Sequence, residues 1–271
     1  MKSILIVGCG NMGGAMLDGW LAAGLDPARF TVADPGMAAA PDGVTLVRSV
    51  PAGRFDAVLL GVKPQLLDAV APQVAGAVGP DTVLLSILAG GELASLSARF
   101  PVNGGIVRIM PNLAAAIGKS PMALASLGLD DVGREAVTAL LAPLGTPEWL
   151  ASEDLFDAVT ALAGCGPAFV YRFIDALAAG AVALGLPEGQ ARRLALATAE
   201  GSALLAGQSP HAPGELARRV ASPGGATQAG LDVLDHGDVL DHGDALADVV
   251  RAAMAAAARR SAEMAASARG D

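Results

Sequence analysis

The stretch that decides the fold is SILIVGCGNMGGA, residues 3–15. It begins with a short continuous apolar run, Ser3 to Val7, which is typical of a strand buried on both faces of a sheet. From Met12 to Ala23, apolar residues recur at helical spacing. A glycine-rich turn joins the two segments, so the stretch predicts a strand, a tight turn and a helix in succession.

The turn, GCGNMG, fits the pattern G-x-G-x-x-G of dinucleotide-binding proteins. Gly8 allows the tight turn, Gly10 lets the backbone approach a pyrophosphate, and Gly13 lets helix and strand pack closely. The helix N-terminus that follows offers free N–H groups and the positive end of a dipole to phosphates. The chain has 34 glycines, so the pattern gains its weight from the strand and the helix on either side.

Further strands are expected where short apolar runs recur along the first half of the chain. These runs lie at 30–33, 44–47, 57–60, 82–87 and 106–109, with a helical pattern at 65–77 between two of them. Alternating strands and helices, with strands apolar enough to be buried, predict an α/β Rossmann-type fold built on a doubly wound parallel sheet.

The character of the sequence changes near residue 152. Beyond it Val, Ile and Thr become sparse, Ala and Leu dominate, and helices are expected at about 154–162, 167–184, 188–206, 212–220 and 245–266. We therefore expect a Rossmann dinucleotide-binding domain over residues 1–152 and an all-helical domain over residues 153–271.

Asp34 ends the second expected strand and is a candidate for cofactor binding. An acidic residue at this place accepts hydrogen bonds from a ribose 2′-OH and would repel the 2′-phosphate of NADP, which modestly favours NADH over NADPH. Arg48 compensates for that repulsion if its loop folds over the ribose. The alternative is a turn aspartate, because Asp34 precedes Pro35 and Asp-Pro favours turns.

Two more stretches follow expected strands and reach the same edge of the sheet. Gly61-Val62-Lys63-Pro64 comes after the fourth strand, at the carboxyl edge where ligands bind in such folds. Lys63 is either a cation near the dinucleotide or a solvated turn lysine. Ala89 and Gly90 end the fifth strand, from which they could approach the nicotinamide side.

Composition excludes several classes of function. The net charge of −9 and an aromatic content of 3% argue against nucleic-acid binding. Two cysteines do not indicate a disulfide framework and favour a reducing cytoplasm. No apolar run is expected to be long enough to span a membrane, because Gly, Asp, Arg or Pro interrupts every one.

A tandem repeat near the C-terminus raises the question of a metal site. Residues 232–237 read DVLDHG and residues 238–243 repeat them. His236 and His242 are six residues apart, which places them on different sides of a helix. We therefore expect a duplication that lengthens a loop, and no metal.

Several stretches together resemble the pyrroline-5-carboxylate reductase family. They are GCGNMG (8–13), GVKPQ (61–65), SILAG (86–90), RIMPN (108–112), DAVTALAGCGPAFVY (157–171) and SPGGATQAGLDVL (222–234). The last two are the most specific, whereas many oxidoreductases share the glycine loop. The resemblance spans nearly the whole chain.

The resemblance implies reduction of 1-pyrroline-5-carboxylate, a cyclic imino acid, to L-proline by NAD(P)H. It also implies a homodimer formed through the helical domain, with dimers commonly assembled into a decamer. The implied substrate contacts are Glu153, Ser222, Gly224, Gly225, Ala226 and Thr227. The implied cofactor contacts are Gly8, Cys9, Gly10, Asn11, Met12, Gly13, Asp34, Val62, Lys63, Pro64 and Ala89, to which Gly90 is added from its place after the fifth strand.

The segment SPGGAT is expected to be a carboxylate nest at a helix start. Backbone N–H groups that point inward bind a carboxylate, and glycine has no side chain to block them. The alternative is a plain loop between helices. The chain departs from the family pattern at Asp34, where NADPH-using members often have serine, and at Arg219, where some members have an asparagine that touches the cofactor.

The chemistry fits an imine better than an alcohol. A protonated cyclic imine is already an electrophile, so a dedicated protein acid is not essential. Similar two-domain β-hydroxyacid dehydrogenases use a lysine of the helical domain, and no lysine follows Lys119 here. A cofactor-sensing module without turnover, another cyclic-imine reductase and a β-hydroxyacid-type oxidoreductase remain the alternatives.

Overall fold

The computed structural model of the chain describes residues 1–236 and 245–269. Contacts divide it into two units: Met1–Gly164 with the part of the last helix from Ala257 on, and Cys165–Ala256. The domain boundary expected near residue 152 remains a prediction, and residues 153–164 contact the first unit more than the second.

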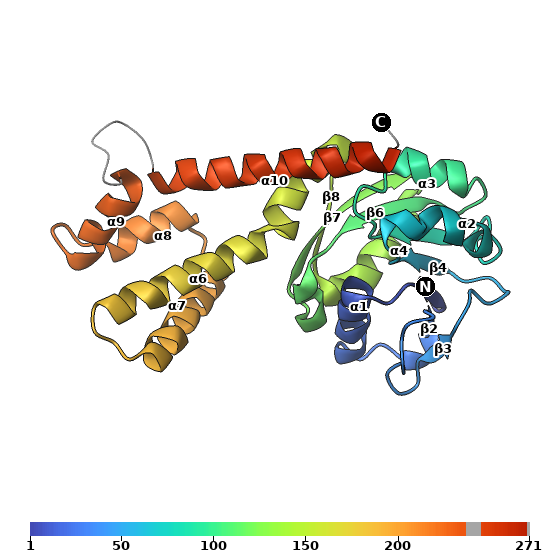
Figure 1. Ribbon diagram of the computed structural model, residues 1–271, viewed down its shortest axis with the longest axis horizontal. Coiled ribbons are helices and arrows are strands. Elements are labelled where there is room, and N and C mark those ends of the chain that lie inside the picture. Colours follow the sequence, from blue (N-terminus) through green and yellow to red (C-terminus); the bar gives the residue numbers. More distant parts are fainter. Residues whose placement is uncertain (237–244, 270–271) are drawn as a thin grey trace. The chain divides into compact units, whose positions relative to one another are not determined.

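The first unit is an eight-stranded sheet with helices on both faces (Figure 1). Its strands are β1 (Ile4–Val7), β2 (Phe30–Ala33), β3 (Thr45–Val47), β4 (Ala57–Leu60), β5 (Val83–Ser86), β6 (Ile106–Met110), β7 (Ser120–Leu127) and β8 (Gly145–Trp149). Its α-helices are α1 (Asn11–Ala22), α2 (Leu67–Ala75), α3 (Leu93–Arg99), α4 (Asp131–Leu141) and α5 (Phe156–Val159).

The sheet has the order β3-β2-β1-β4-β5-β6-β7-β8, and β1 to β6 run parallel. Strand β1 lies between β2 and β4, with Val7 beside Ala33 on one side and Leu60 on the other. The direction of chain progression reverses there, and ligands of such folds bind at that point of the carboxyl edge. The predicted doubly wound Rossmann-type fold is therefore confirmed.

Burial on both faces explains the continuous apolar run of β1. Ile4 and Ile6 belong to one core cluster with Met16 and Trp20 of α1. Leu5 and Val7 belong to a second cluster on the other face, with side chains of α2 and α3. Because alternate residues of a strand point to opposite faces, every position of β1 is apolar.

Two strands at one edge of the sheet were not expected from the sequence. β7 pairs antiparallel to β6, and β8 pairs parallel to β7. The sequence of β7, SPMALASL, contains a proline, two serines and two alanines, and β8 reads GTPEW. Neither gives the apolar run that marks β1 and β4.

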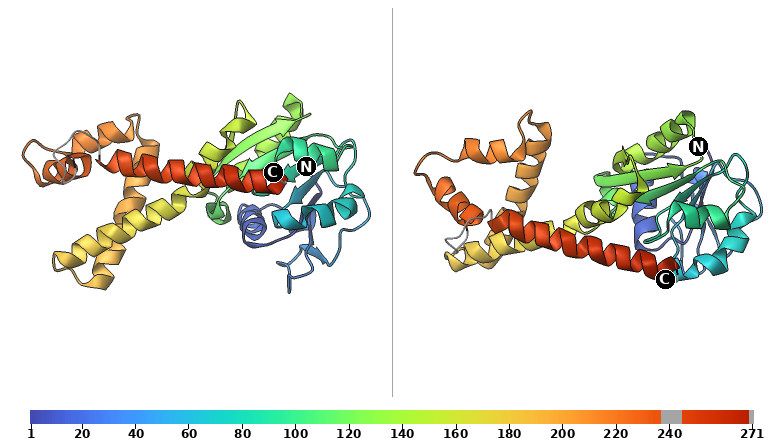
Figure 2. Two further views of the ribbon diagram at one scale, coloured as in Figure 1. Left: turned by 45° about the horizontal axis from the view of Figure 1, so that its top comes forward. Right: turned by 90° about the horizontal axis from the view of Figure 1, so that it is seen from above.

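The second unit is helical (Figure 2). Its helices are α6 (Gly166–Ala183), α7 (Glu188–Gln208), α8 (Pro213–Val220), α9 (Ala226–His236) and the first part of α10 (Ala245–Arg269). The expected helix beginning at Ala245 extends to Arg269. The repeat of DVLDHG lies largely outside the described residues, since 237–244 are not among them.

One helical run is long and apolar enough, by length and composition alone, to cross a membrane. It extends over Glu153–Ala183, and 6% of its most apolar window is buried. The expectation that no stretch reaches this threshold is therefore wrong. Exposed apolar surface of this kind is typical of a contact with another protein or with a membrane.

Candidate dinucleotide and substrate site

The predicted cofactor residues gather at the carboxyl edge of β1, β2, β4 and β5. The loop after β4 meets the end of β1, since the N–H of Gly61 donates to Val7 O at 2.8 Å. It also approaches the loop after β1, because a Cβ on Gly61 would clash with Gly8 O. The N–H of Gly8 donates to Ala33 O at 3.0 Å and ties the glycine loop to β2. Hydrogen bonds of the sheet thus bring the three loops to one place.

The three glycines of the motif have three different reasons to be glycine. Gly8 has φ +82°, and a Cβ there would lie 2.8 Å from Val62 N. A Cβ on Gly13 would lie 3.0 Å from Gly8 O, which is close helix–strand packing. At Gly10, no described atom beyond the chain neighbours lies within 4 Å of the Cβ position. Packing therefore does not require Gly10, and its bare backbone is left open to a ligand.

The N-terminus of α1 fits a pyrophosphate. The first backbone bond of the helix joins Gly14 N to Gly10 O at 2.8 Å, so the N–H groups of Asn11, Met12 and Gly13 precede the hydrogen-bond ladder. The first turn has no acidic residue and the Gly10 cap has no side chain. These features fit a dinucleotide phosphate, and all of them lie where the motif places its cofactor.

The Asp34 carboxylate is fixed by backbone donors. Its Oδ2 accepts from Cys9 N at 2.7 Å, and its Oδ1 accepts from Gly36 N at 2.8 Å and Met37 N at 3.2 Å. Arg48 donates to the carbonyl oxygens of residues 34, 35 and 37 and so clasps the same turn. This geometry agrees with both interpretations of Asp34. The carboxylate stabilises its own turn, and it also lies beside the glycine loop where a cofactor would bind.

Cys9 contributes no charge to the loop at neutral pH. Burial, and then the nearby carboxylates of Asp34 and Asp18, raise the pKa of its thiol to about 11. The thiol therefore stays protonated and leaves the site free of a second negative group that would repel phosphate.

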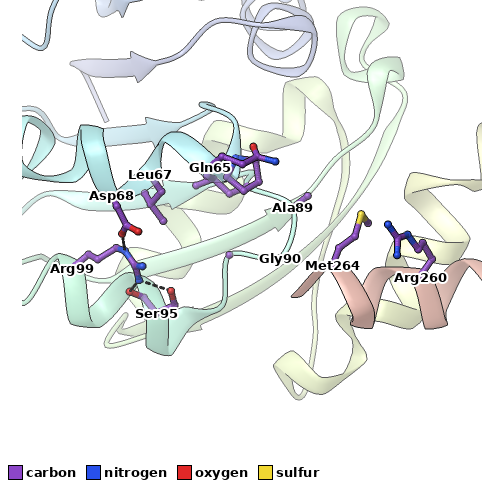
Figure 3. A pocket seen from close by; sticks show the side chains of 12 residues that line it. Gln65, Leu67, Asp68, Ala89, Gly90, Ser95, Arg99, Arg260 and Met264 are labelled. Carbon is purple, nitrogen blue, oxygen red and sulfur yellow. Dashed lines mark hydrogen bonds and ion pairs between the residues drawn. The ribbon is translucent and has the colours of Figure 1, made fainter. Parts of the chain in front are cut away.

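The loop after β5 borders a cavity of about 450 Å³. Figure 3 shows Ala89 and Gly90 at its centre, Gln65 above them, and Arg260 and Met264 on α10. On the opposite wall, Arg99 Nε donates to Asp68 Oδ1 at 2.7 Å and its NH1 donates to Ser95. Pro64, Ala89 and Gly90 of the predicted set line this cavity, whereas Lys63 is exposed outside it.

Glu153 lies inside the first unit and is bound to protein groups. Its Oε1 accepts from Arg108 at 2.8 Å and from the N–H of Leu93, at the start of α3, at 2.9 Å. Arg108 is buried, and its guanidinium lies 4.2 Å from the centroid of the Phe156 ring. The sequence did not mark Arg108 as a functional residue, although it opens the RIMPN stretch. The substrate role of Glu153 remains a prediction.

The segment 222–227 lies in the second unit and includes the first two residues of α9. Gly224 has φ +70°, and Gly225 N donates to Ser222 O at 2.9 Å. The first bond of the helix joins Ala229 N to Gly225 O at 3.1 Å, so the N–H groups of residues 226–228 precede the ladder. A Cβ on Gly225 would lie 2.5 Å from Ser222 Oγ, which explains this glycine by local packing.

Comparison with known proteins places the chain in a family. Residues 153–264 match a family described as pyrroline-5-carboxylate reductase dimerisation, and residues 3–90 match one described as NADP oxidoreductase, coenzyme F420-dependent. A pyrroline-5-carboxylate reductase of Pseudomonas aeruginosa is 35% identical over 270 residues, covering 97% of this chain and 96% of its own. The chain belongs to the pyrroline-5-carboxylate reductase family.

Solved structures of pyrroline-5-carboxylate reductases have the same fold. The Coxiella burnetii protein superposes with a TM-score of 0.84 at 25% identity, covering 97% of this chain and 98% of its own. The Plasmodium falciparum protein, solved with NADP bound, gives a TM-score of 0.82 at 24% identity over 97% and 98%. At 24% identity the likeness shows the fold alone.

Arg219, where the chain departs from the family pattern, and the isolated histidine His211 have local partners in the second unit. Arg219 Nε donates to Glu215 Oε1 at 3.0 Å, and Arg218 donates to the other oxygen at 2.8 Å. These hydrogen bonds lower the pKa of the Glu215 carboxyl. His211 is half-buried and its N–H donates to Ser209 Oγ at 3.1 Å, as in a turn between helices.

Proposed function

We propose that the chain reduces 1-pyrroline-5-carboxylate to L-proline with NAD(P)H, the last step of proline biosynthesis. The observation that carries the proposal is the 35% identity to a pyrroline-5-carboxylate reductase over almost the full length of both chains. The open backbone at Gly10 and the N–H groups that precede the first hydrogen bond of α1 support binding of a dinucleotide to the first unit. When bound, NAD(P)H supplies the hydride.

The protein's own part is binding and orientation. The 8–13 loop holds the pyrophosphate through backbone N–H groups, and Val62, Lys63, Pro64, Ala89 and Gly90 border the nicotinamide end. The N–H groups of Ala226 and Thr227, with the hydroxyls of Thr227 and Ser222, bind the substrate carboxylate at the positive end of α9. Orienting donor and acceptor accounts for a large share of the barrier that such an enzyme removes.

A proton donor is not needed for this substrate, because the protonated imine is already electrophilic. The absence of lysine from residues 120–271 fits that chemistry. It disfavours a β-hydroxyacid, whose hydroxyl must lose a proton as the hydride moves. An imine of a six-membered ring differs by one methylene, which a pocket discriminates by only about 1–3 kcal/mol.

NADH is modestly favoured over NADPH in this proposal. The Asp34 carboxylate is held by three backbone N–H groups and cannot easily turn away from a 2′-phosphate. Arg48 is the one cation that contacts the turn among the described residues, and its guanidinium is partly occupied by carbonyl oxygens. It therefore offsets the repulsion only in part.

The assembly proposed is a homodimer formed through the helical unit, with dimers free to associate further, up to a decamer. The match of residues 153–264 to a dimerisation family and the exposed apolar side chains of α6 support it. The apolar run Glu153–Ala183 is then covered by a second copy and not by lipid. The working compartment is the cytoplasm.

Initial rates with 1-pyrroline-5-carboxylate, measured with NADH and with NADPH, test the function. We expect turnover with both and a modest preference for NADH. Asp34→Ser should shift the preference toward NADPH by about tenfold, equivalent to 1.4 kcal/mol, because it removes the charge that repels the 2′-phosphate. Asp42→Ser, an exposed aspartate of the same unit, is the matched control and should leave the ratio unchanged.

Three outcomes separate the alternatives. If wild type turns over the substrate and Asp34→Ser has the same coenzyme preference, the chain is the proposed reductase but Asp34 does not set its coenzyme preference. Faster turnover of the six-membered imine than of 1-pyrroline-5-carboxylate would identify the six-membered imine as the preferred substrate. Binding of a coenzyme without turnover of either imine would favour the sensing module.

A further inference from the structure

The loop between β5 and α3 is contacted by the end of the chain. Gly90 has φ +73°, and a Cβ there would lie 3.2 Å from Ala265 Cα and 3.5 Å from Met264 O. A side chain at residue 90 would therefore press against the backbone of α10. The glycine gives the loop its left-handed turn and also leaves room for the helix.

A second contact fixes the same part of α10. Ser261 Oγ is hydrogen-bonded to Asp157 Oδ1 at 2.7 Å, although the two residues are 104 positions apart. Ala265, one turn further along, is 7% exposed. Ala262, three residues before it, is exposed. One face of the helix end is thus held against the first unit, and the other faces outward.

The side of α10 next to the held face borders the cavity at the end of β5. Met264 and Arg260 are one turn apart on α10, and Figure 3 shows them facing the loop that carries Ala89 and Gly90. Arg260 is oriented by Glu263, whose Oε2 accepts from its NH1 at 2.7 Å. Pro64, Ala89 and Gly90 in this lining are the residues assigned to the nicotinamide end of the cofactor.

We propose that residues 257–269 are a positioning element for the nicotinamide end of the cofactor site. The inference rests on the proposed function. Ala265 holds the β5–α3 loop through Gly90, and Met264 and Arg260 form the wall that faces Ala89. The loop is anchored on its other side by Glu153, which accepts from Leu93 N. With α10 in place the loop is clamped from both ends and presents Ala89 in one position.

The test compares binding of complete coenzymes with binding of fragments that lack the nicotinamide. Ala265→Leu enlarges the buried side of the helix and pushes it from Gly90, whereas Ala262→Leu makes the same change on the exposed side. Dissociation constants are measured by titration for NADH and NADPH, and for ADP-ribose and its 2′-phosphate, which lack nicotinamide. We expect Ala265→Leu to weaken both complete coenzymes by at least about fivefold, or 1 kcal/mol. The nicotinamide-free fragments should bind as to wild type, and Ala262→Leu should change neither.

A smaller variant guards against loss of folding. Ser261→Ala removes one hydrogen bond to Asp157 and should weaken the complete coenzymes about two- to threefold, again without effect on the fragments. Equal weakening of coenzymes and fragments, or no weakening in either variant, would overturn the inference. A wild-type chain that binds neither nucleotide would contradict the proposed function itself, which is a different result from a failure confined to α10.

Discussion

The two units use their apolar residues in opposite ways. The first buries several large side chains completely, among them Trp20, Phe30, Phe100 and Phe156. In the second, the buried residues of the described chain are alanines: Ala178, Ala191 and Ala195. Larger apolar side chains of that unit are exposed, including Tyr171 at 68% and Leu184 at 88%.

This contrast indicates what each unit needs for stability. Burying apolar area supplies most of the favourable free energy of folding, and a methyl group contributes little of it. The first unit carries its own core. The second carries apolar surface that becomes a core only when something covers it, in agreement with its match to a dimerisation family.

The largest expected effect is the loss of core volume in the first unit. Leu17→Ala removes a fully buried side chain of α1 and should lower the free energy of unfolding by about 2–5 kcal/mol. Leu196→Ala makes the same change at a side chain that is 58% exposed in α7 and should cost less than about 0.5 kcal/mol in the monomeric chain. Urea unfolding at protein concentrations where light scattering reports a monomer compares the two. Equal losses would remove the contrast between the units.

The next effect concerns what covers the second unit. On α6, Phe169, Phe173 and Leu177 are exposed and four residues apart, so they form one stripe along the helix. Phe173→Glu places a charge in that stripe and should weaken self-association by at least about hundredfold, or 2.7 kcal/mol. Light scattering across a dilution series measures it. Ala179→Glu, at an exposed position about 120° around α6 from Phe173, is the control.

Either of two results would contradict the dimer proposal. Phe173→Glu could associate as strongly as wild type, or wild type itself could remain a monomer at micromolar concentration. Partitioning of wild type into lipid vesicles would instead assign the apolar run Glu153–Ala183 to a membrane.

Sequence predicted best what is encoded locally. The apolar runs of β1 and β4 mark strands because a buried parallel strand is apolar at every position. The glycine loop could be predicted because its three glycines lie within six residues. In contrast, β7 is held by pairing with β6 and β8, and its own residues carry no strand pattern. Tertiary pairing overrides weak local preference in such a segment.

The parts of the site that sequence missed come from distant segments. Arg108 and Glu153 are 45 positions apart, and Gly90 meets an alanine of the last helix. A glycine against the backbone of an alanine-rich helix leaves no chemical signature in either segment. Only the fold brings such residues together.

A substitution of Glu153 tests whether this residue stabilises the first unit. Glu153→Gln keeps an oxygen for Leu93 N–H but removes the charge that faces buried Arg108, so it should lower the free energy of unfolding by about 1–3 kcal/mol. Glu148→Gln, an exposed glutamate of β8, should change it little. Chemical unfolding measures both variants, and rates across imine concentrations measure KM. A raised KM with unchanged stability would support the substrate role of Glu153 and weaken its assignment to the first unit.

The smallest effect is the dependence of the first unit on the charge of Asp56. The backbone N–H of Lys2, together with Ser3, holds the pKa of the Asp56 carboxyl below its usual value of 3.8. A lowered pKa in the folded state means that the stabilisation is complete above about pH 4 and is lost as the pH falls through the folded-state value. Asp56 is exposed, so solvent screening keeps its contribution below about 1 kcal/mol.

Asp56→Asn should therefore differ from wild type by less than about 1 kcal/mol at neutral pH, and the difference should shrink below about pH 4. Unfolding by urea at a series of pH values measures it, with exposed Asp81→Asn as the control. Because Asp56 anchors the N-terminal segment that leads into β1, the effect belongs to the first unit alone and should not change with protein concentration. A difference that grew on dilution would instead link the amino ends of β1 and β4 to self-association. The first unit would then not be stable independently of assembly, and the contrast between the two units would fail there.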